Sequence, residues 1–264
     1  MSSILDWLTK KLLGDSADDL NWAITTLRKK SGIACALLKK TEADKVEIIV
    51  DPYIACPIYE PLPPVTIRLL GRISPEGMAA DLAHELFHHH QFSCLDFNRN
   101  SLDVEDAERF SCALEAAADC ASMAICAEIA QAGDEGPFDA MRIDSHRKKI
   151  THLFYKHLDI FSDDPSRFTI PMREAFFAWH GAESLASHYK DTARQAKNHT
   201  LATHPERMAE WGTHKLRLSD ILAIATLPGQ KKSWLDPNDP RLAALLDSAP
   251  GTPPVPRKKT APGY

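Results

Sequence analysis

The sequence lacks three features that would place it in common classes of protein. Its six cysteines form no CxxC pair and no disulfide-framework spacing, so we expect reduced, mostly buried thiols. Its longest apolar stretches are far short of the roughly 20 residues that span a bilayer, which argues against a membrane partner. Its 31 basic and 36 acidic side chains leave a net charge of −5, which offers no global attraction to nucleic acid.

The N-terminus also lacks the basic region, apolar core and cleavage site that a secretory leader carries in sequence. We therefore expect a cytoplasmic protein. What the chain does have is 44% apolar residues over 264 positions, enough to bury a sizeable core. We expect one domain over residues 1–248. Residues 249–264 are rich in proline and cannot bury apolar surface, so they are predicted to be a disordered tail.

The periodicity of the sequence predicts an α+β fold that is mostly helical. N-terminal helices are expected over residues 1–32, a small, mainly antiparallel sheet over 33–71, two helices over 74–132 and a helical C-terminal part over 143–225. The sheet thus precedes the first of the two central helices.

Three short segments are candidates for the strands of this sheet. Ile33–Leu38 and Val46–Val50 are predicted to form a hairpin, and Val65–Leu70 is predicted to add a third strand. Between them, Asp51–Pro64 holds five prolines and is predicted to be an extended loop.

One motif points to chemistry: His84-Glu85-Leu86-Phe87-His88 spells H-E-x-x-H. On a helix, residues four apart lie one above the other, so the two imidazoles converge on one point and Glu85 flanks it. This is the geometry of a metal ion with a base beside it. The motif therefore predicts two metal ligands, His84 and His88, and a general base, Glu85.

The residues around the motif predict a helix. Ser74 is a good N-cap, Pro75 fits the first helical position, and Glu76 places an acid in the first turn. Apolar side chains then recur at helical spacing, at Met78, Ala79, Leu82, Ala83 and Leu86. The motif is therefore expected inside a helix rather than in a loop.

A third ligand has to come from another segment, because catalytic zinc typically takes three protein ligands and a water molecule. The alanine-rich segment from Asp103 to Ala132 is predicted to be a helix that stops at Gly133. Glu115 and Asp119 share one stripe of it with small side chains, where an unpaired carboxylate would be costly. We expect Glu115 to bind the metal and Asp119 to accept a hydrogen bond from the outer nitrogen of a ligand histidine.

H-E-x-x-H followed by E-x-x-x-D on a second helix resembles the gluzincin branch of the zinc metallopeptidases. Residues 114–119 are similar to the E-x-x-A-D helix of the HtpX and CAAX prenyl protease group, and residues 203–207 are loosely similar to the T-H-P-P motif and arginine of those families. The soluble ImmA/IrrE-type and Lit-type bacterial metalloproteases share the same helix pair and fit the absence of membrane spans better. The resemblance implies a zincin-like domain that binds one Zn²⁺ ion per chain.

These residues suggest a reaction. Zinc held by His84, His88 and Glu115 would lower the pKa of its bound water to about 7. Glu85 would take the proton as that water attacks a peptide carbonyl, and would then pass the proton to the leaving amine.

The oxyanion formed in this attack needs a hydrogen-bond donor besides the metal. His204 is the first choice for that donor, with His180 and Arg207 as alternatives. Another alternative places Cys94 or Cys112 at the metal, although buried cysteine is common without any such role.

The expected partner is a protein or peptide substrate, added as an extended strand along Val65–Leu70. Two classes of function remain open. One is a soluble zinc metallopeptidase with few protein targets, and the other is a non-catalytic regulatory or interaction protein on the same scaffold. Glu85 favours the peptidase, because a protein that only binds has no need of a base at that position.

Overall fold

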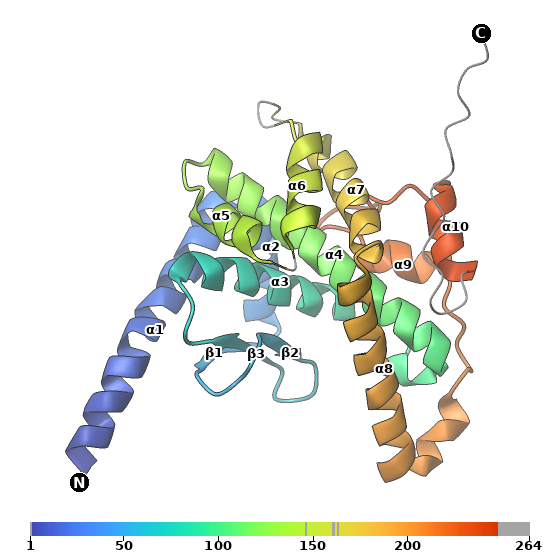
Figure 1. Ribbon diagram of the computed structural model, residues 1–264, viewed down its shortest axis with the longest axis horizontal. Coiled ribbons are helices and arrows are strands. Elements are labelled where there is room, and N and C mark those ends of the chain that lie inside the picture. Colours follow the sequence, from blue (N-terminus) through green and yellow to red (C-terminus); the bar gives the residue numbers. More distant parts are fainter. Residues whose placement is uncertain (1, 146, 160–161, 163, 248–264) are drawn as a thin grey trace.

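The computed structural model describes residues 2–145, 147–159, 162 and 164–247 (Figure 1). Within these residues the fold is α+β and mostly helical, as predicted. The elements, with η for short 3₁₀ helices, are α1 (Ser2–Lys30), α2 (Gly32–Ala43), β1 (Glu47–Asp51), β2 (Ile58–Glu60), β3 (Thr66–Leu70), α3 (Pro75–Ser93), η1 (Arg99–Ser101), α4 (Val104–Gln131), α5 (Gly136–Ile143), α6 (Lys148–His157), η2 (Pro165–Phe168), α7 (Thr169–His180), α8 (Glu183–Thr203), η3 (Pro205–Glu210), α9 (Leu218–Ile224) and α10 (Pro240–Asp247). The predicted tail, 249–264, lies outside the described residues.

The three strands form a mixed sheet in the order β1-β3-β2, rather than a mainly antiparallel one. β1 runs parallel to β3, with Glu47 opposite Thr66, and β2 runs antiparallel to β3. β1 and β3 match two of the predicted strands. β2 lies in the proline-rich stretch that was expected to be a loop, so β3 is the central strand and has a neighbour on both sides.

The predicted hairpin is wrong, because residues 33–38 belong to α2. The Ser31 hydroxyl caps this helix by accepting a hydrogen bond from the backbone N–H of Ala34 at 3.0 Å. Its buried residues recur at helical spacing, at Ala34, Leu37, Leu38 and Thr41. A short apolar run fits a buried strand or a buried helix equally well, so the cap at Ser31 was the signal that distinguished them.

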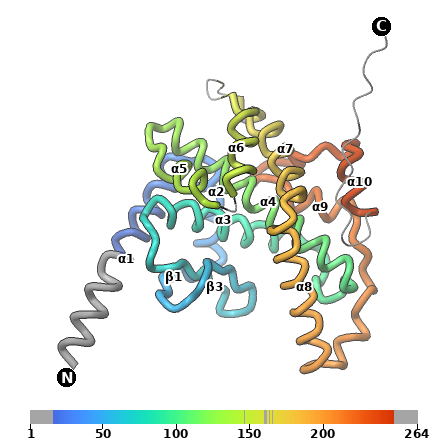
Figure 2. The backbone as a smooth tube through the Cα atoms, in the orientation of Figure 1, coloured from blue at the N-terminus to red at the C-terminus, as the bar shows by residue number. Residues whose placement is uncertain are grey.

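Both helices of the predicted metal site form where the sequence placed them. Ser74 caps α3, its hydroxyl accepting from the Gly77 backbone N–H at 3.1 Å. Asp103 caps α4 in the same way, its carboxylate accepting from the Asp106 backbone N–H at 2.8 Å. In Figure 2 the strands lie below α3, and α6 and α7 lie above it.

α4 is the central helix of the core. It packs against α3, α5, α7, α8 and α9, and many of its buried residues are alanine, which lets neighbouring helices approach closely. Of the helices in the described ranges, α4 is the one whose length and apolar composition would suit a membrane span. However, 89% of that apolar window is buried inside the molecule, so α4 is a core helix.

We expect Ser31→Ala to lower the free energy of unfolding by about 1–2 kcal/mol, because it removes the cap of α2. It also removes the Ser31 hydroxyl that donates to the Glu128 carboxylate at 2.5 Å. Urea unfolding followed by circular dichroism measures the change. Ser187→Ala, at an exposed position of α8, is the control and should change the free energy by less than about 0.5 kcal/mol. Equal effects of the two substitutions would contradict the capping role.

Candidate metal centre

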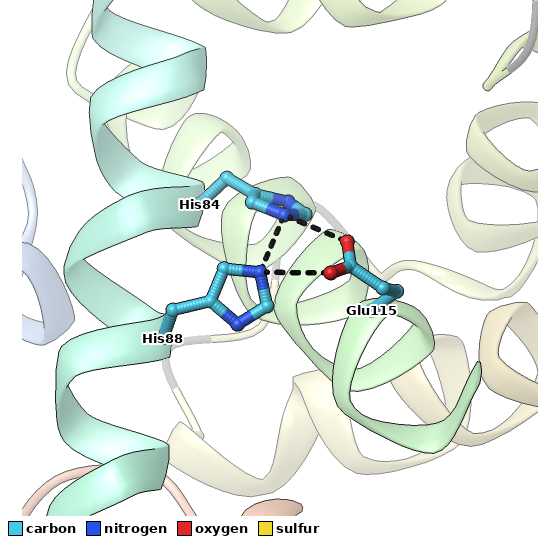
Figure 3. Close-up of side chains that lie close together, drawn as sticks. All are labelled: His84, His88 and Glu115. Atoms are coloured by element: carbon cyan, nitrogen blue, oxygen red, sulfur yellow. Dashed lines mark hydrogen bonds and ion pairs between the residues drawn. The ribbon is translucent and has the colours of Figure 1, made fainter. Parts of the chain in front are cut away.

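Two helices bring two histidines and a carboxylate to one point (Figure 3). His84 and His88 lie one turn apart on α3, and their Nε2 atoms are 3.0 Å apart. Glu115 reaches them from α4, with one carboxylate oxygen 3.3 Å from His84 Nε2 and the other 3.4 Å from His88 Nε2. The ligand atoms of the three residues all lie within 4.8 Å of one another. The structure therefore brings together the three ligands that the sequence predicted.

This set of donor atoms fits a divalent metal ion. In a tetrahedral site with bonds of about 2.0–2.1 Å, neighbouring donor atoms are about 3.3 Å apart. Here the two Nε2 atoms are 3.0 Å apart, and each lies near a different oxygen of the Glu115 carboxylate, at 3.3 and 3.4 Å. The two imidazole nitrogens face each other and also face the carboxylate. One cation between them could accept a lone pair from each of the three groups. His84, His88 and Glu115 could therefore hold a metal.

The outer nitrogen of each ligand ring faces an acceptor. His84 Nδ1 lies 3.0 Å from Asp119 Oδ1, the residue that the sequence predicted as its acceptor, but the two atoms are not aligned for a hydrogen bond. His88 Nδ1 lies 2.8 Å from Gln91 Oε1. The Gln91 amide nitrogen donates to backbone carbonyl oxygens of α4 and α9 at 3.0 and 3.2 Å. Because both amide hydrogens are used in this way, the amide oxygen accepts from His88, and His88 Nε2 is left free to bind a metal.

Asp119 is buried and has three partners. Besides His84, it accepts hydrogen bonds from Arg147 Nε at 2.9 Å and from the Trp179 indole N–H at 3.0 Å. Burial alone would raise the pKa of Asp119, but the Arg147 charge and the contact with His84 hold that pKa below its usual value. The sequence predicted that zinc and a histidine would compensate the buried carboxylates of α4. Arg147 is a further positive group that compensates Asp119.

Positive and negative groups balance one another within the cluster. Burial alone would raise the pKa of Glu115, but the nearby His88 and the hydrogen bond with His84 hold it well below its usual range. Burial alone would lower the pKa of His84, but the carboxylates of Asp119 and Glu115, 3.0 and 3.3 Å away, raise it to about 10. Both carboxylates stay negative, and the groups around them provide positive charge.

Glu85 lies beside this cluster on α3 and is only 5% exposed. Burial raises its pKa, while His84 and His88 oppose the rise. A carboxyl group whose pKa is raised toward neutral pH can both accept and return a proton. The position suits the general base that the sequence predicted.

The structure does not bring His204 to this cluster. Its side chain is 53% exposed and lies 3.3 Å from Glu206, just past the C-terminal end of α8. Tyr189, near the other end of α8, lies close enough to Glu115 for the charge of this carboxylate to raise its pKa, and the helix from there to Thr203 is about 20 Å long. The prediction that His204 faces the oxyanion therefore needs correction, and Arg207 lies beyond His204 along the chain.

The remaining alternatives have other surroundings. His180 packs against aromatic rings of α7, and burial lowers its pKa to about 3. Cys94 lies 3.7 Å from His90 Nε2, and the Cys112 thiol donates to a backbone carbonyl oxygen of α8. Neither cysteine belongs to the group of residues that could hold the metal.

Tyr189 on α8 is a residue of the site that the sequence did not indicate. Burial and the negative charges of Glu115 and Asp119 raise its pKa well above the ordinary value, so its hydroxyl keeps the proton. Its ring lies 5.7 Å from that of Trp179. No local motif could have revealed it, because its partner Glu115 lies on a helix distant in sequence.

We expect Asp119→Asn to lower the free energy of unfolding of the metal-free protein by about 2–3 kcal/mol, because it removes the most buried of the carboxylates that pair with Arg147, leaving Asp81 and Asp144. Urea unfolding in the presence of a chelator measures this without a contribution from metal loss. Asp191→Asn is the control, since Asp191 is 60% exposed and pairs with Arg194 at the surface. It should cost less than about 0.5 kcal/mol. A similar loss for both variants would argue against a structural role for the Asp119 network.

Comparison with known proteins gives one match. No curated protein and no solved structure matches the chain. One family model matches residues 17–208, a span that contains His84, Glu85, His88, Glu115 and Asp119. The chain belongs to the family described as "Putative metallopeptidase family (DUF6782)".

Proposed function

We propose that the protein is a zinc-dependent peptidase of the gluzincin type that hydrolyses peptide bonds in a restricted set of protein targets. The observation that carries the proposal is the convergence of His84, His88 and Glu115 with the buried Glu85 beside them. Two histidines and a glutamate, with the fourth position open, are a ligand set of catalytic zinc. Bound here, zinc would act as a Lewis acid and lower the pKa of a water molecule to about 7.

In this proposal Glu85 is the general base. It takes a proton from the attacking water and passes it to the nitrogen of the leaving amine, so its carboxyl group ends the cycle as it began. Its burial and raised pKa support this role. A protein that only bound a partner would gain nothing from a buried carboxyl group here, which makes the non-catalytic alternative the weaker of the two.

Tyr189 replaces His204 as the proposed donor to the oxyanion. Burial and the charges of Glu115 and Asp119 raise its pKa, so its hydroxyl keeps the proton and lies in the neighbourhood of both carboxylates. A phenol O–H directed at the carbonyl oxygen would stabilise the negative charge that develops there.

The proposed path of the substrate is the free edge of β2. β3 was the expected docking strand, but its two edges are occupied by β1 and β2. β2 packs on α3 through Tyr59, whose ring contacts His89 and Phe92, close to the metal ligands in sequence. An extended peptide could add to this edge as a strand, and exposed Ile58 and Leu62 beside it suit apolar side chains.

The cysteines support a cytoplasmic location as part of this proposal. All six are free, and three of them, Cys112, Cys120 and Cys126, are buried. Free thiols persist in a reducing compartment.

Metal analysis of the purified protein tests the assigned roles. We expect about one zinc per chain in the wild type and in Glu85→Gln, and a large loss of zinc in Glu115→Ala, because a histidine pair alone binds zinc weakly. Cleavage in a peptide-library digest should be lost in both variants. Glu135→Gln, at an exposed position before α5, should retain zinc and cleavage and serves as the control.

Two results would count against the peptidase. Zinc retained in all forms with cleavage by none would favour the non-catalytic regulatory or interaction protein. Full cleavage by Glu85→Gln would remove Glu85 from the mechanism.

We expect Tyr189→Phe to lower kcat about 10- to 100-fold with zinc content unchanged, because it removes one donor to the oxyanion. His204→Ala should leave kcat and KM unchanged, since His204 is exposed at the far end of α8. Steady-state kinetics on one cleaved peptide compares the two. The reverse result, with His204→Ala impaired and Tyr189→Phe active, would restore His204 as the donor.

A further inference from the structure

Arg99 lies next to the proposed peptide path and is held there by an aromatic ring. Its guanidinium carbon is 4.0 Å from the centroid of the Phe92 ring. The Phe92 ring in turn contacts Tyr59 of β2 edge to face, with centroids 5.1 Å apart. Arg99 begins η1 and is an exposed residue. The stack therefore orients a solvent-accessible cation beside the edge strand.

In the part of the chain that the structure describes, no carboxylate forms an ion pair with Arg99. Burial lowers the pKa of Arg99 to about 10, so the guanidinium is still charged near pH 7, and the one titratable group that acts on it is Tyr59, which is neutral there. Lys197 is a second cation in this region. Burial lowers the pKa of Lys197, and the nearby charge of Arg99 lowers it further. Its ammonium group is already bound to backbone carbonyl oxygens. The guanidinium is thus the positive group available to an incoming anion.

The distance from Arg99 to the metal cluster fits a peptide subsite. Phe92 follows the ligand His88 by one turn on the same face of α3, which is about 6 Å along the axis. Together with the 4.0 Å of the stack, this rise sets a spacing on the order of 10 Å between the guanidinium and the cluster. An extended peptide advances about 3.3 Å per residue. Arg99 would therefore meet the substrate about three residues from the bond that is cleaved.

We infer that Arg99 is a specificity-determining residue that binds a carboxylate of the peptide substrate about three residues from the scissile bond. The inference rests on the proposed function, because it assumes that a peptide lies along β2. Two sources supply this anion, the side chain of Asp or Glu and the C-terminal carboxylate of a short peptide. Either can accept two parallel N–H bonds from a guanidinium.

A peptide series tests the inference. Each peptide carries Glu, Gln or Lys at one of the positions up to four residues on either side of the bond, and each is made with a free and an amidated C-terminus. The wild type should cleave the peptides with Glu about three residues from the bond with kcat/KM about tenfold higher than their Gln counterparts, mainly through KM. If the anion is instead the C-terminus, the free acid alone should show this gain.

Variants of Arg99 separate charge recognition from a structural effect. Arg99→Glu should reverse the preference toward Lys at the same position, and Arg99→Lys should retain only part of the preference for Glu, because an ammonium group lacks the paired donors. Arg142→Gln is the control, since Arg142 lies on α5, is 62% exposed and pairs with Asp139. It should keep the wild-type preference.

The outcomes distinguish this inference from the proposed function. Cleavage without any preference for an acid, or an unchanged preference in Arg99→Glu, overturns the inference and leaves the peptidase proposal in place. If the wild type cleaves no peptide, the peptidase proposal fails, and calorimetric binding of the same series decides the inference. Equal dissociation constants for the Glu and Gln peptides would then overturn it.

Discussion

The contact between His84 of α3 and the two carboxylates of α4 is the interaction on which the rest of the molecule depends. Glu115 and Asp119 lie on one stripe of the central helix, where a negative charge without a partner would be strongly destabilising. Their partners come from separate segments: an imidazole from α3, the Arg147 guanidinium from the turn before α6 and the Trp179 indole from α7. The polar contact that each segment makes with these carboxylates fixes the orientation of that segment against α4.

The small side chains of α4 make this arrangement possible. Alanines surround Glu115 and Asp119 along the helix, so the helices packed against α4 come close enough for short polar contacts. A helix with bulkier residues at these positions would hold α3 farther away, and Glu115 would not reach the two imidazoles. The composition that gives α4 the appearance of a membrane segment is thus the composition that a closely packed, polar centre requires.

Local signals explain how much of the fold and site could be predicted. The helices around His84 and Glu115 were predictable, because caps, charges and spacing along each segment all agreed. The prediction of a strand at residues 33–38 is wrong, since six apolar residues carry no decisive period and only the cap at Ser31 marks the start of a helix there. β2 was missed because prolines suggested a loop.

The residues that complete the site were beyond the reach of sequence reasoning for a different reason. Arg147 and Tyr189 join the cluster through helix packing between segments far apart in the chain, and no motif marks them. His204 was selected by a motif resemblance, but the length of α8 carries it away from the metal ligands. Gln91 was within reach, since it lies one turn after His88 on the same helix.

Gln91 also ties the protonation of a ligand to a distant part of the chain. Its amide group is oriented by the carbonyl oxygens of Leu114 and Ile224, and this orientation selects the tautomer of His88. Ile224 belongs to α9, which lies outside the region matched by the family model. A fragment trimmed to the family boundary would keep every ligand but free one hydrogen of this amide. The amide could then flip, and the His88 proton would no longer be confined to the side away from Glu115.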